Sequence, residues 1–179
     1  MSKLLSLSSV NKLKHQNKSI FILIGGGSGS GKNYFASKLD FPLVDVDFEN
    51  ERINHGKIDC LNTVSEAIRI VKEKTNQFLQ KKESFLQVST ASKIKGTENK
   101  FKLAKSFDYI TVFIHINCPI IRAIKNNDHR VKLGGHGKTL KREKIILTKL
   151  GSDLVFNKLK NSSLVDFYLE IQSNGIKHV

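Results

Sequence analysis

The chain has 179 residues, 39% of them hydrophobic, which is enough to bury one core and short for two domains. Lys and Arg number 30 against 16 Asp and Glu, and the resulting charge of +14 favours anionic partners. Only 8% of the residues are aromatic and none is Trp, so stacking on nucleic-acid bases is not expected. No apolar run approaches the ~20 residues of a membrane helix, so no membrane association is expected.

The two cysteines, Cys60 and Cys118, lie far apart in the sequence and form no CxxC pair. The sequence therefore predicts neither a disulfide framework nor a zinc site, and a reducing cytoplasm is the expected location. Residues 1–19 mix Leu and Ser with Lys and lack the compact apolar centre of a signal peptide. We interpret them as a basic lead-in segment, partly disordered or helical, before a single domain of residues 20–179.

From residue 19 onward, strand-like and helix-like segments alternate. Short runs of β-branched and aromatic residues predict strands, and apolar residues at helical spacing predict helices, with Thr63 or Ser65 as the N-cap of the longest helix. The expected elements are strands over 19–24, 42–47, 85–89, 109–116 and 165–171 and helices over 33–40, 63–82, 119–133 and 140–159. Strands that alternate with helices imply parallel βαβ units, so we expect an α/β fold of three layers, with a mainly parallel sheet flanked by helices.

A glycine-rich segment follows the first expected strand. The GxxxxGK pattern of a phosphate-binding P-loop is satisfied, between a strand and a helix, by Gly26, Gly27, Ser28, Gly29, Ser30, Gly31 and Lys32. Glycines let successive amides turn toward a phosphate, and Lys32 would reach the β- and γ-phosphates of ATP or GTP. Asn33 stands where a Ser or Thr would bind Mg²⁺, and its bulkier, differently placed carbonyl can still accept the metal or a metal-bound water. The alternative is a Gly-Ser turn without this function.

Two carboxylates end the second expected strand. A carboxylate at the carboxyl end of a strand beside a P-loop can take the proton of an acceptor hydroxyl. Side chains alternate along a strand, so Asp45 and Asp47 would share one face. Asp47, last in the strand, is the better candidate base. For Asp45 we expect a structural role, in which one of the two carboxylates caps the following turn and the other is solvated, and a place on the substrate side is its alternative role.

Phosphoryl transfer also calls for a cationic clamp, which the planar guanidinium of Arg provides better than Lys. Arg130 precedes the glycine break at residues 134–135, and His136 follows that break. A helix end that meets a glycine turn beside a nucleotide site is suited to a lid. On spacing alone, the two residues could equally be a solvated helix end and a turn histidine.

The order of these motifs resembles the zeta toxin family and its small zeta-like relatives, which are P-loop kinases related to chloramphenicol phosphotransferase. The resemblance extends from Ile20 to about Gly175, and its most specific part is Arg130-Val-Lys-Leu-Gly-Gly-His136. It implies that Asp47 is the general base and that Lys32 and Arg130 stabilise the transferring phosphoryl group. It also implies that the acceptor is the 3′-hydroxyl of UDP-N-acetylglucosamine and that a small antitoxin protein occludes the nucleotide site.

The same resemblance places Ser89 and Thr90 near the acceptor pocket and His136 in the site. Relatives have a Glu shortly before that Thr, where this chain has Gln87 or Val88, and they have a Ser or Thr in place of Asn33. Residues 137–140 insert after the Gly-Gly-His segment and lack the Pro of the relatives. A second Arg of the family aligns best with Lys149, which keeps the charge and loses the bidentate fork.

The sequence therefore favours a small-molecule kinase that uses ATP or GTP, with a nucleotide sugar as acceptor. A second hypothesis is a nucleotide-binding protein that has lost turnover, for which Asn33 and Lys149 are the motivation. A third, drawn from the charge of +14, is a polynucleotide kinase or a nucleic-acid-directed P-loop ATPase. It ranks last because no nucleic-acid-binding motif is visible.

Overall fold

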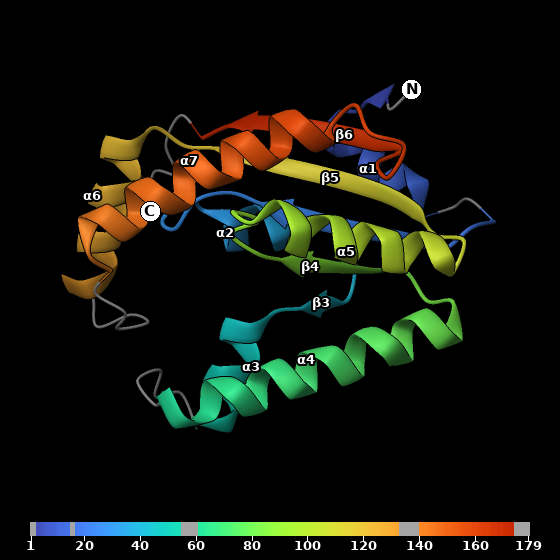
Figure 1. The fold of residues 1–179 in the computed structure, drawn as a ribbon, viewed down its shortest axis with the longest axis horizontal. Helices are drawn as coiled ribbons and strands as arrows, with labels where there is room; N and C mark the ends of the chain where they lie inside the picture. The colour runs from blue at the N-terminus through green and yellow to red at the C-terminus, as the bar shows by residue number, and fades with distance from the viewer. Residues whose placement is uncertain (1–2, 15–16, 55–60, 133–139, 174–179) are drawn as a thin grey trace.

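Six parallel strands form one sheet in the order β1-β6-β5-β2-β4-β3 (Figure 1). The computed structural model describes residues 3–14, 17–54, 61–132 and 140–173. The strands are β1 (Lys3–Leu4), β2 (Ile20–Gly25), β3 (Leu43–Val44), β4 (Phe85–Val88), β5 (Ile110–Asn117) and β6 (Phe167–Gln172). In register, Gly25 pairs with His115 and Ile24 with Val88, so the carboxyl ends of the three central strands meet at one edge.

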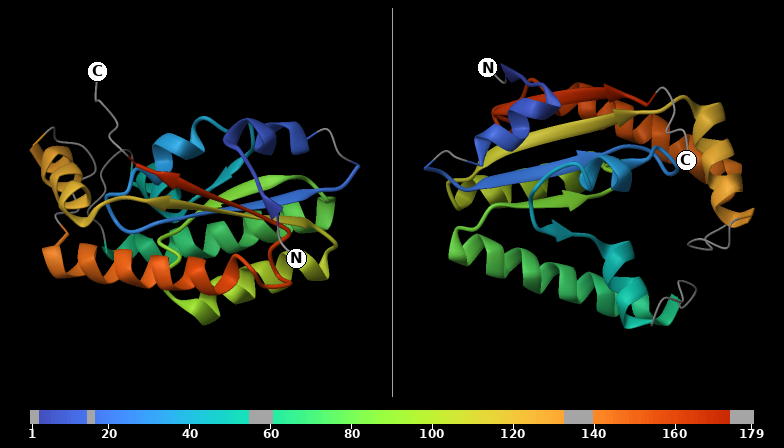
Figure 2. Two further views of the ribbon diagram at one scale, coloured as in Figure 1. Left: turned by 90° about the horizontal axis from the view of Figure 1, so that it is seen from above. Right: turned by 180° about the vertical axis from the view of Figure 1, so that it is seen from behind.

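Helices cover both faces of this sheet, as Figure 2 shows from above and from behind. They are α1 (Leu7–Leu13), α2 (Lys32–Ala36), α3 (Val46–Ile53), α4 (Leu61–Lys81), α5 (Ile94–Ser106), α6 (Ile120–Lys132) and α7 (Arg142–Leu159). Helices α1 and α2 pack on one face, and α4, α5 and α7 lie on the other. The expected three-layer α/β fold with a parallel sheet is thus confirmed.

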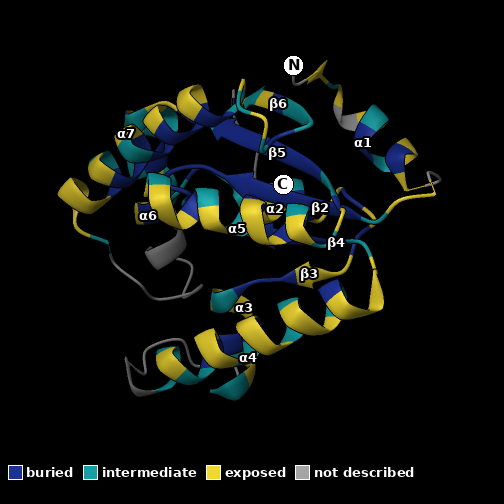
Figure 3. Cartoon of the chain, turned by 45° about the vertical axis from the view of Figure 1, so that its right-hand side comes forward, coloured by how far each residue is buried: buried dark blue, intermediate teal, exposed yellow. Residues whose placement is uncertain are grey.

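The centre of the molecule is the fully buried strand β2, whose alternate side chains serve the two layers (Figure 3). Ile20, Ile22 and Ile24 join the core under α1 and α2, whereas Phe21 and Leu23 join the core under α4, α5 and α7. In the second core, Phe21 contacts the ring of Phe85 with ring centroids 5.1 Å apart. Because β2 is held on both faces, the loop that follows it starts from a rigid position.

The strand expected over 42–47 is shorter than predicted, and this moves its two carboxylates. β3 ends at Val44, and Asp45 is the N-cap of α3, where its Oδ1 accepts a hydrogen bond of 2.9 Å from the amide of Phe48. The cap satisfies an amide at the helix start and so favours the helix over two more strand residues. Of the two carboxylates, Asp45 is therefore the one that caps. The placement of Asp47 at the end of a strand is wrong, since Asp47 lies in the first turn of α3.

The long helix α4 begins at Leu61, so the expected N-caps Thr63 and Ser65 are wrong. Thr63 instead joins α4 to α3: its hydroxyl donates to Asn50 Oδ1 at 2.7 Å and accepts from Asn54 Nδ2 at 2.6 Å. A polar side chain early in a helix is therefore used for a tertiary contact rather than a local cap.

Two parts of the chain hold structure that the sequence pattern did not predict. Helix α5 was not expected, although Thr97, Phe101 and Ala104 bury one face of it. Within the expected lead-in segment, α1 agrees with the helical interpretation, whereas the pairing of β1 at the sheet edge and the burial of Val10 and Leu13 on one face were not expected. Within the described ranges, no helix is both long and apolar enough to cross a membrane.

Candidate functional site

The P-loop lies directly after β2, at the carboxyl edge of the sheet, and its backbone requires glycine at two turns. Gly29 and Gly31 have φ of 77° and 88°, which residues with a Cβ rarely adopt. A Cβ on Gly29 would also lie 2.4 Å from the carbonyl oxygen of Ala123 in α6. The glycine pattern seen in the sequence is therefore imposed by the turn and by the close approach of α6.

Helices α6 and α7 hold this loop from two sides. Asn126 of α6 donates to the carbonyl of Gly29 at 2.9 Å, and the amide of Ser28 donates to Thr148 Oγ1 of α7 at 3.0 Å. A Cβ on Gly27 would lie 2.8 Å from the Cα of Lys149, so α7 packs against the loop backbone itself. Sequence reasoning did not find Asn126 or Thr148, because their partners are about a hundred residues away and no local pattern marks them.

Lys32 opens α2 and folds back over the loop. Its Nζ donates to the carbonyls of Gly26 and Gly27, each at 2.9 Å. The hydroxyl of Ser30 is fully buried and, among the described residues, has no hydrogen-bond partner. It lies inside the turn, since a Cβ on Gly26 would be 2.7 Å from it. A buried hydroxyl without a partner is costly, and a phosphate oxygen at the loop would satisfy it, so the residues present fit a phosphate group.

Asp45 and Asp47 stand at the start of α3, where β3 ends at the carboxyl edge of the sheet. Asp45 is buried, and burial raises the pKa of its carboxyl, against the opposing effect of the Phe48 amide. The neighbouring charge of Asp47 raises this pKa further, and the charge of Lys32 lowers it. Asp47 itself is exposed. Asp45 is therefore within electrostatic reach of Lys32, while Asp47 presents an accessible carboxylate.

Ser89 and Thr90 form a tight turn at the end of β4. The amide of Ser89 continues the sheet by donating to the carbonyl of Ile24 at 3.0 Å, and its hydroxyl accepts from the amide of Ala91 at 3.2 Å. Ala91 has a φ of 47°, a conformation that costs free energy outside glycine and is found often at functional sites. A Cβ on Gly25 would lie 2.9 Å from the Cβ of Ala91, so this turn adjoins the start of the P-loop.

Gln87, one of the two positions at which the resemblance implies a Glu, is buried and points to α4. Its amide donates to Thr75 Oγ1 at 3.1 Å. The site therefore has no carboxylate from β4 at this position. Asp45 and Asp47 are two carboxylates at the start of α3 that act on each other electrostatically, and Asp45 is also within reach of the charge of Lys32.

Lys149 lies on the buried side of α7, behind the loop. Its ammonium forms an ion pair with Asp153, whose other oxygen lies 2.9 Å from Nε2 of His115 at the end of β5. The His115 ring stacks on Phe156 with centroids 4.7 Å apart, and burial lowers the pKa of its imidazole, against the opposing effect of Asp153. This row of Lys149, Asp153 and His115 was not predicted. The i, i+4 spacing of Lys149 and Asp153 was the one local signal.

The residues that the sequence analysis expects in a lid are only partly within the described structure. Arg130 belongs to the last part of α6, but its side chain is outside what is described, and His136 lies outside the described residues. Asn33 is exposed in α2. Within the described ranges, no group of three or more His, Cys, Asp or Glu side chains could hold a metal ion.

The parallel sheet with a GxxxxGK loop after its central strand defines the class: this chain has a three-layer α/β fold of the P-loop kinase kind. No protein-family model matches the sequence, and no curated protein matches it either. The likeness is to solved structures at low identity, and it shows the fold.

Three solved structures illustrate the likeness. The complex of AvrRxo1-ORF1 and -ORF2 with ATP matches with a TM-score of 0.71 and 12% identity, over 95% of this chain and 59% of that one. The PezAT chromosomal toxin-antitoxin system of Streptococcus pneumoniae matches with a TM-score of 0.65 and 16% identity, over 93% and 74%. Shikimate kinase from Acinetobacter baumannii, in complex with shikimate, matches with a TM-score of 0.54 and 15% identity, over 93% and 88%.

Proposed function

We propose that this protein is an ATP- or GTP-dependent phosphotransferase of the zeta toxin type, which transfers the γ-phosphoryl group to a hydroxyl of a small molecule. The observation that carries the proposal is the P-loop, in which the partnerless Ser30 hydroxyl and the Lys32 ammonium both lie at the turn, next to the carboxylates of α3. Neighbours of this fold include a complex with ATP and a shikimate kinase, which supports the reaction class.

On the donor side, Lys32 would leave the carbonyls of Gly26 and Gly27 for the β- and γ-phosphates. The loop amides and Ser30 would bind the remaining phosphate oxygens, while α6 and α7 keep the loop in place. Mg²⁺ would neutralise charge on the phosphates, and Asn33 would reach it directly or through a water molecule. Arg130 would add charge stabilisation to the transferring group, as the family resemblance implies.

On the acceptor side, we assign the general base to Asp47. Its carboxylate is exposed, whereas an oxygen of Asp45 is committed to the cap of α3. Asp45 would act on the substrate through its charge, and Ser89 and Thr90 would bind acceptor hydroxyls from the end of β4. Lys149, paired with Asp153 behind the loop, would support the loop and the lid that contains His136.

UDP-N-acetylglucosamine is the first acceptor to test, because the motif order resembles zeta toxins. The same resemblance leads us to propose an antitoxin protein as a partner and the cytoplasm as the location. The similar PezAT structure belongs to a toxin-antitoxin system, and this supports a partner of that kind. We take residues 20–179 as the kinase domain, with the segment before it adding β1 to the domain's sheet and packing α1 on one face.

The test is transfer from ATP and Mg²⁺ to UDP-N-acetylglucosamine, to simple alcohols and sugars, and to an oligonucleotide with a 5′-hydroxyl, followed by mass spectrometry. We expect a product heavier by one phosphoryl group and equimolar ADP. Asp47→Asn should lower the rate by about 10²- to 10⁴-fold, the range of general-base catalysis. Asp108→Asn, at the opposite edge of the sheet, is the matched control and should keep the wild-type rate.

The outcomes separate the alternatives. Transfer only to the oligonucleotide would replace the small-molecule acceptor with a polynucleotide. Tight ATP binding without transfer to any acceptor would identify a nucleotide-binding protein that has lost turnover. Equal rates for wild type and Asp47→Asn, with a loss in Asp45→Asn, would move the base to Asp45, because Asn at the N-cap keeps the hydrogen bond to Phe48.

A further inference from the structure

A cleft of about 440 Å³ lies between α4 and α5, against the face of β2 and β4 that these helices cover. Most of its wall is apolar. Phe21, Phe85, Leu79 and Val71 form its buried floor, and Ile68 and Leu103 are exposed at its rim, each at 41%. This volume falls within the roughly 300–1,000 Å³ of small-molecule sites, which are mostly apolar with few polar groups.

The polar residues that line the cleft include two cations, the exposed Lys72 of α4 and the less exposed Lys100 of α5. Thr75 and Gln87 bond to each other, and Thr75 also donates to the carbonyl of Val71 at 2.7 Å. Lys100 of α5 is partly buried and makes no hydrogen bond or ion pair with any residue in the described part of the chain. Burial lowers the pKa of its ammonium, and the charge of Asp45 raises it. Asp45 is therefore near enough to act on Lys100 but is not bonded to it.

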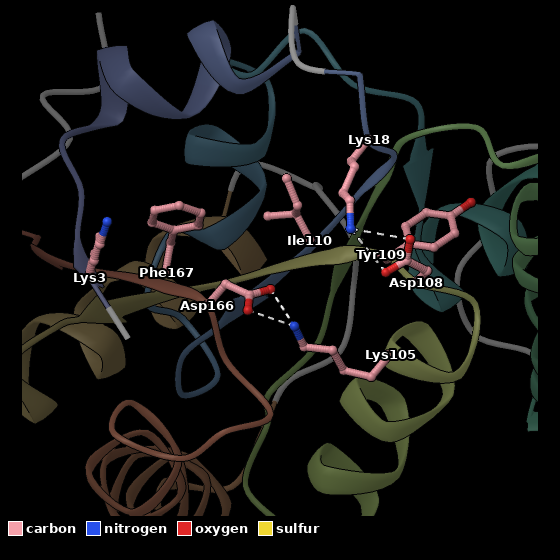
Figure 4. A pocket seen from close by; sticks show the side chains of 8 residues that line it. All are labelled: Lys3, Lys18, Lys105, Asp108, Tyr109, Ile110, Asp166 and Phe167. Carbon is pink, nitrogen blue, oxygen red and sulfur yellow. Dashed lines mark hydrogen bonds and ion pairs between the residues drawn. The ribbon is translucent and has the colours of Figure 1, made fainter. Parts of the chain in front are cut away.

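Two of the three lysines of a second pocket show the opposite arrangement. This pocket lies where β5 begins, and Figure 4 shows Lys105 turned toward Asp166 and Lys18 toward Asp108, while Lys3 lies apart from both aspartates. Lys105 Nζ lies 2.6 Å from Asp166 Oδ1, and Lys18 Nζ lies 3.1 Å from Asp108 Oδ1. These cations are already paired within the protein, whereas Lys100 is not. The contrast indicates that the Lys100 ammonium in the α4–α5 cleft is available to pair with a ligand.

We infer that the α4–α5 cleft binds an amphipathic anion, whose apolar body covers Phe21, Phe85 and Leu79 and whose carboxylate pairs with Lys100. A cation beside apolar walls is costly unless an anion neutralises it, and a carboxylate does so with a charge-assisted hydrogen bond. The apolar floor gives the ligand body its favourable burial. No P-loop residue lines the cleft, so this site is separate from the nucleotide site and does not depend on phosphoryl transfer.

Sodium octanoate and 1-octanol are the probes, because they share an alkyl chain and differ in the charged head. Binding is measured by isothermal titration calorimetry on the full chain without nucleotide. We expect octanoate to bind the wild type and Lys100→Met to weaken it about tenfold or more, the loss of one charge-assisted bond. Lys102→Met, an exposed neighbour on the same helix, should bind octanoate as the wild type does. Octanol affinity should be the same in all three proteins.

Leu103→Glu provides a second variant that leaves the Lys100 side chain in place. Its new carboxylate would lie one turn from Lys100 on the same face of α5 and would repel a bound anion. We expect octanoate binding to fall and octanol binding to change less. The inference is overturned if octanoate does not bind the wild type, or if Lys100→Met and Lys102→Met bind it equally, whatever the transferase assay shows.

Discussion

Gly29→Ala tests whether the P-loop is positioned by its contact with α6. An alanine at this position would have to adopt a φ of 77°, and its Cβ would lie 2.4 Å from the carbonyl oxygen of Ala123. The left-handed conformation costs roughly 1–2 kcal/mol, and overpacking a rigid contact costs roughly 1–3 kcal/mol more. The sum is about 2–5 kcal/mol, and at about 2–4 °C per kcal/mol for a chain of this size we expect the melting temperature to fall by about 4–20 °C.

Gly96→Ala is the matched control. It lies in α5, and a Cβ there would have no neighbour within 4 Å. Replacing a glycine inside a helix should stabilise the fold by about 0.5–1 kcal/mol, so this variant should melt at or slightly above the wild-type temperature. Thermal unfolding followed by circular dichroism, with and without ATP, measures both variants. If Gly29→Ala has the melting temperature of the wild type and ATP raises that temperature equally in both proteins, the contact with α6 does not position the loop.

Three further predictions concern stability. Thr148→Val should lower the free energy of unfolding by about 0.5–1.5 kcal/mol in urea, because the Ser28 amide loses its acceptor; an unchanged value would show that water replaces the hydroxyl. Burial raises the pKa of Asp45, so wild-type stability relative to Asp45→Asn should fall as the pH rises through and above 3.8, and a difference that is flat between pH 3 and 7 would contradict this. Asp166 behaves in the opposite sense: although burial opposes it, the bonds from Lys105 and Thr111 hold the pKa of its carboxyl below the ordinary 3.8. Asp166→Asn should therefore destabilise the protein near pH 7, and the difference should shrink as the pH falls below 3.8.

Local patterns predicted the central part of the fold well. β2 is a continuous apolar run and β5 a mainly apolar one, and both are buried on both faces, which is the sequence signature of central parallel strands. The GxxxxGK segment between a strand and a helix predicted the loop, and Gly29 and Gly31 adopt the conformations that such a loop requires. One of Asp45 and Asp47 was expected to cap the following turn, and the bond from the Phe48 amide to Asp45 is a local interaction of the kind that sequence reveals.

The errors and omissions arose where tertiary contacts decide the structure. Alternation suggested a strand through Asp47, but the cap at Asp45 starts a helix two residues earlier. Helix α5 was missed because lysines surround its buried residues, although Thr97, Phe101 and Ala104 follow helical spacing. The support of the P-loop by Asn126 and Thr148 joins segments about a hundred residues apart, and no short pattern encodes such a pair.

The most direct test of the account is the affinity for ATP of the wild type, Lys32→Met and Lys38→Met, measured by isothermal titration calorimetry. Lys38 is exposed just after α2, with its ammonium 5.0 Å from the centre of the Tyr34 ring, and serves as the control. Loss of a charged contact to phosphate is worth about 1.5–3 kcal/mol, so Lys32→Met should bind ATP about ten- to a hundredfold more weakly while Lys38→Met binds as the wild type does. Equal affinities for Lys32→Met and the wild type would contradict a phosphate site at this loop.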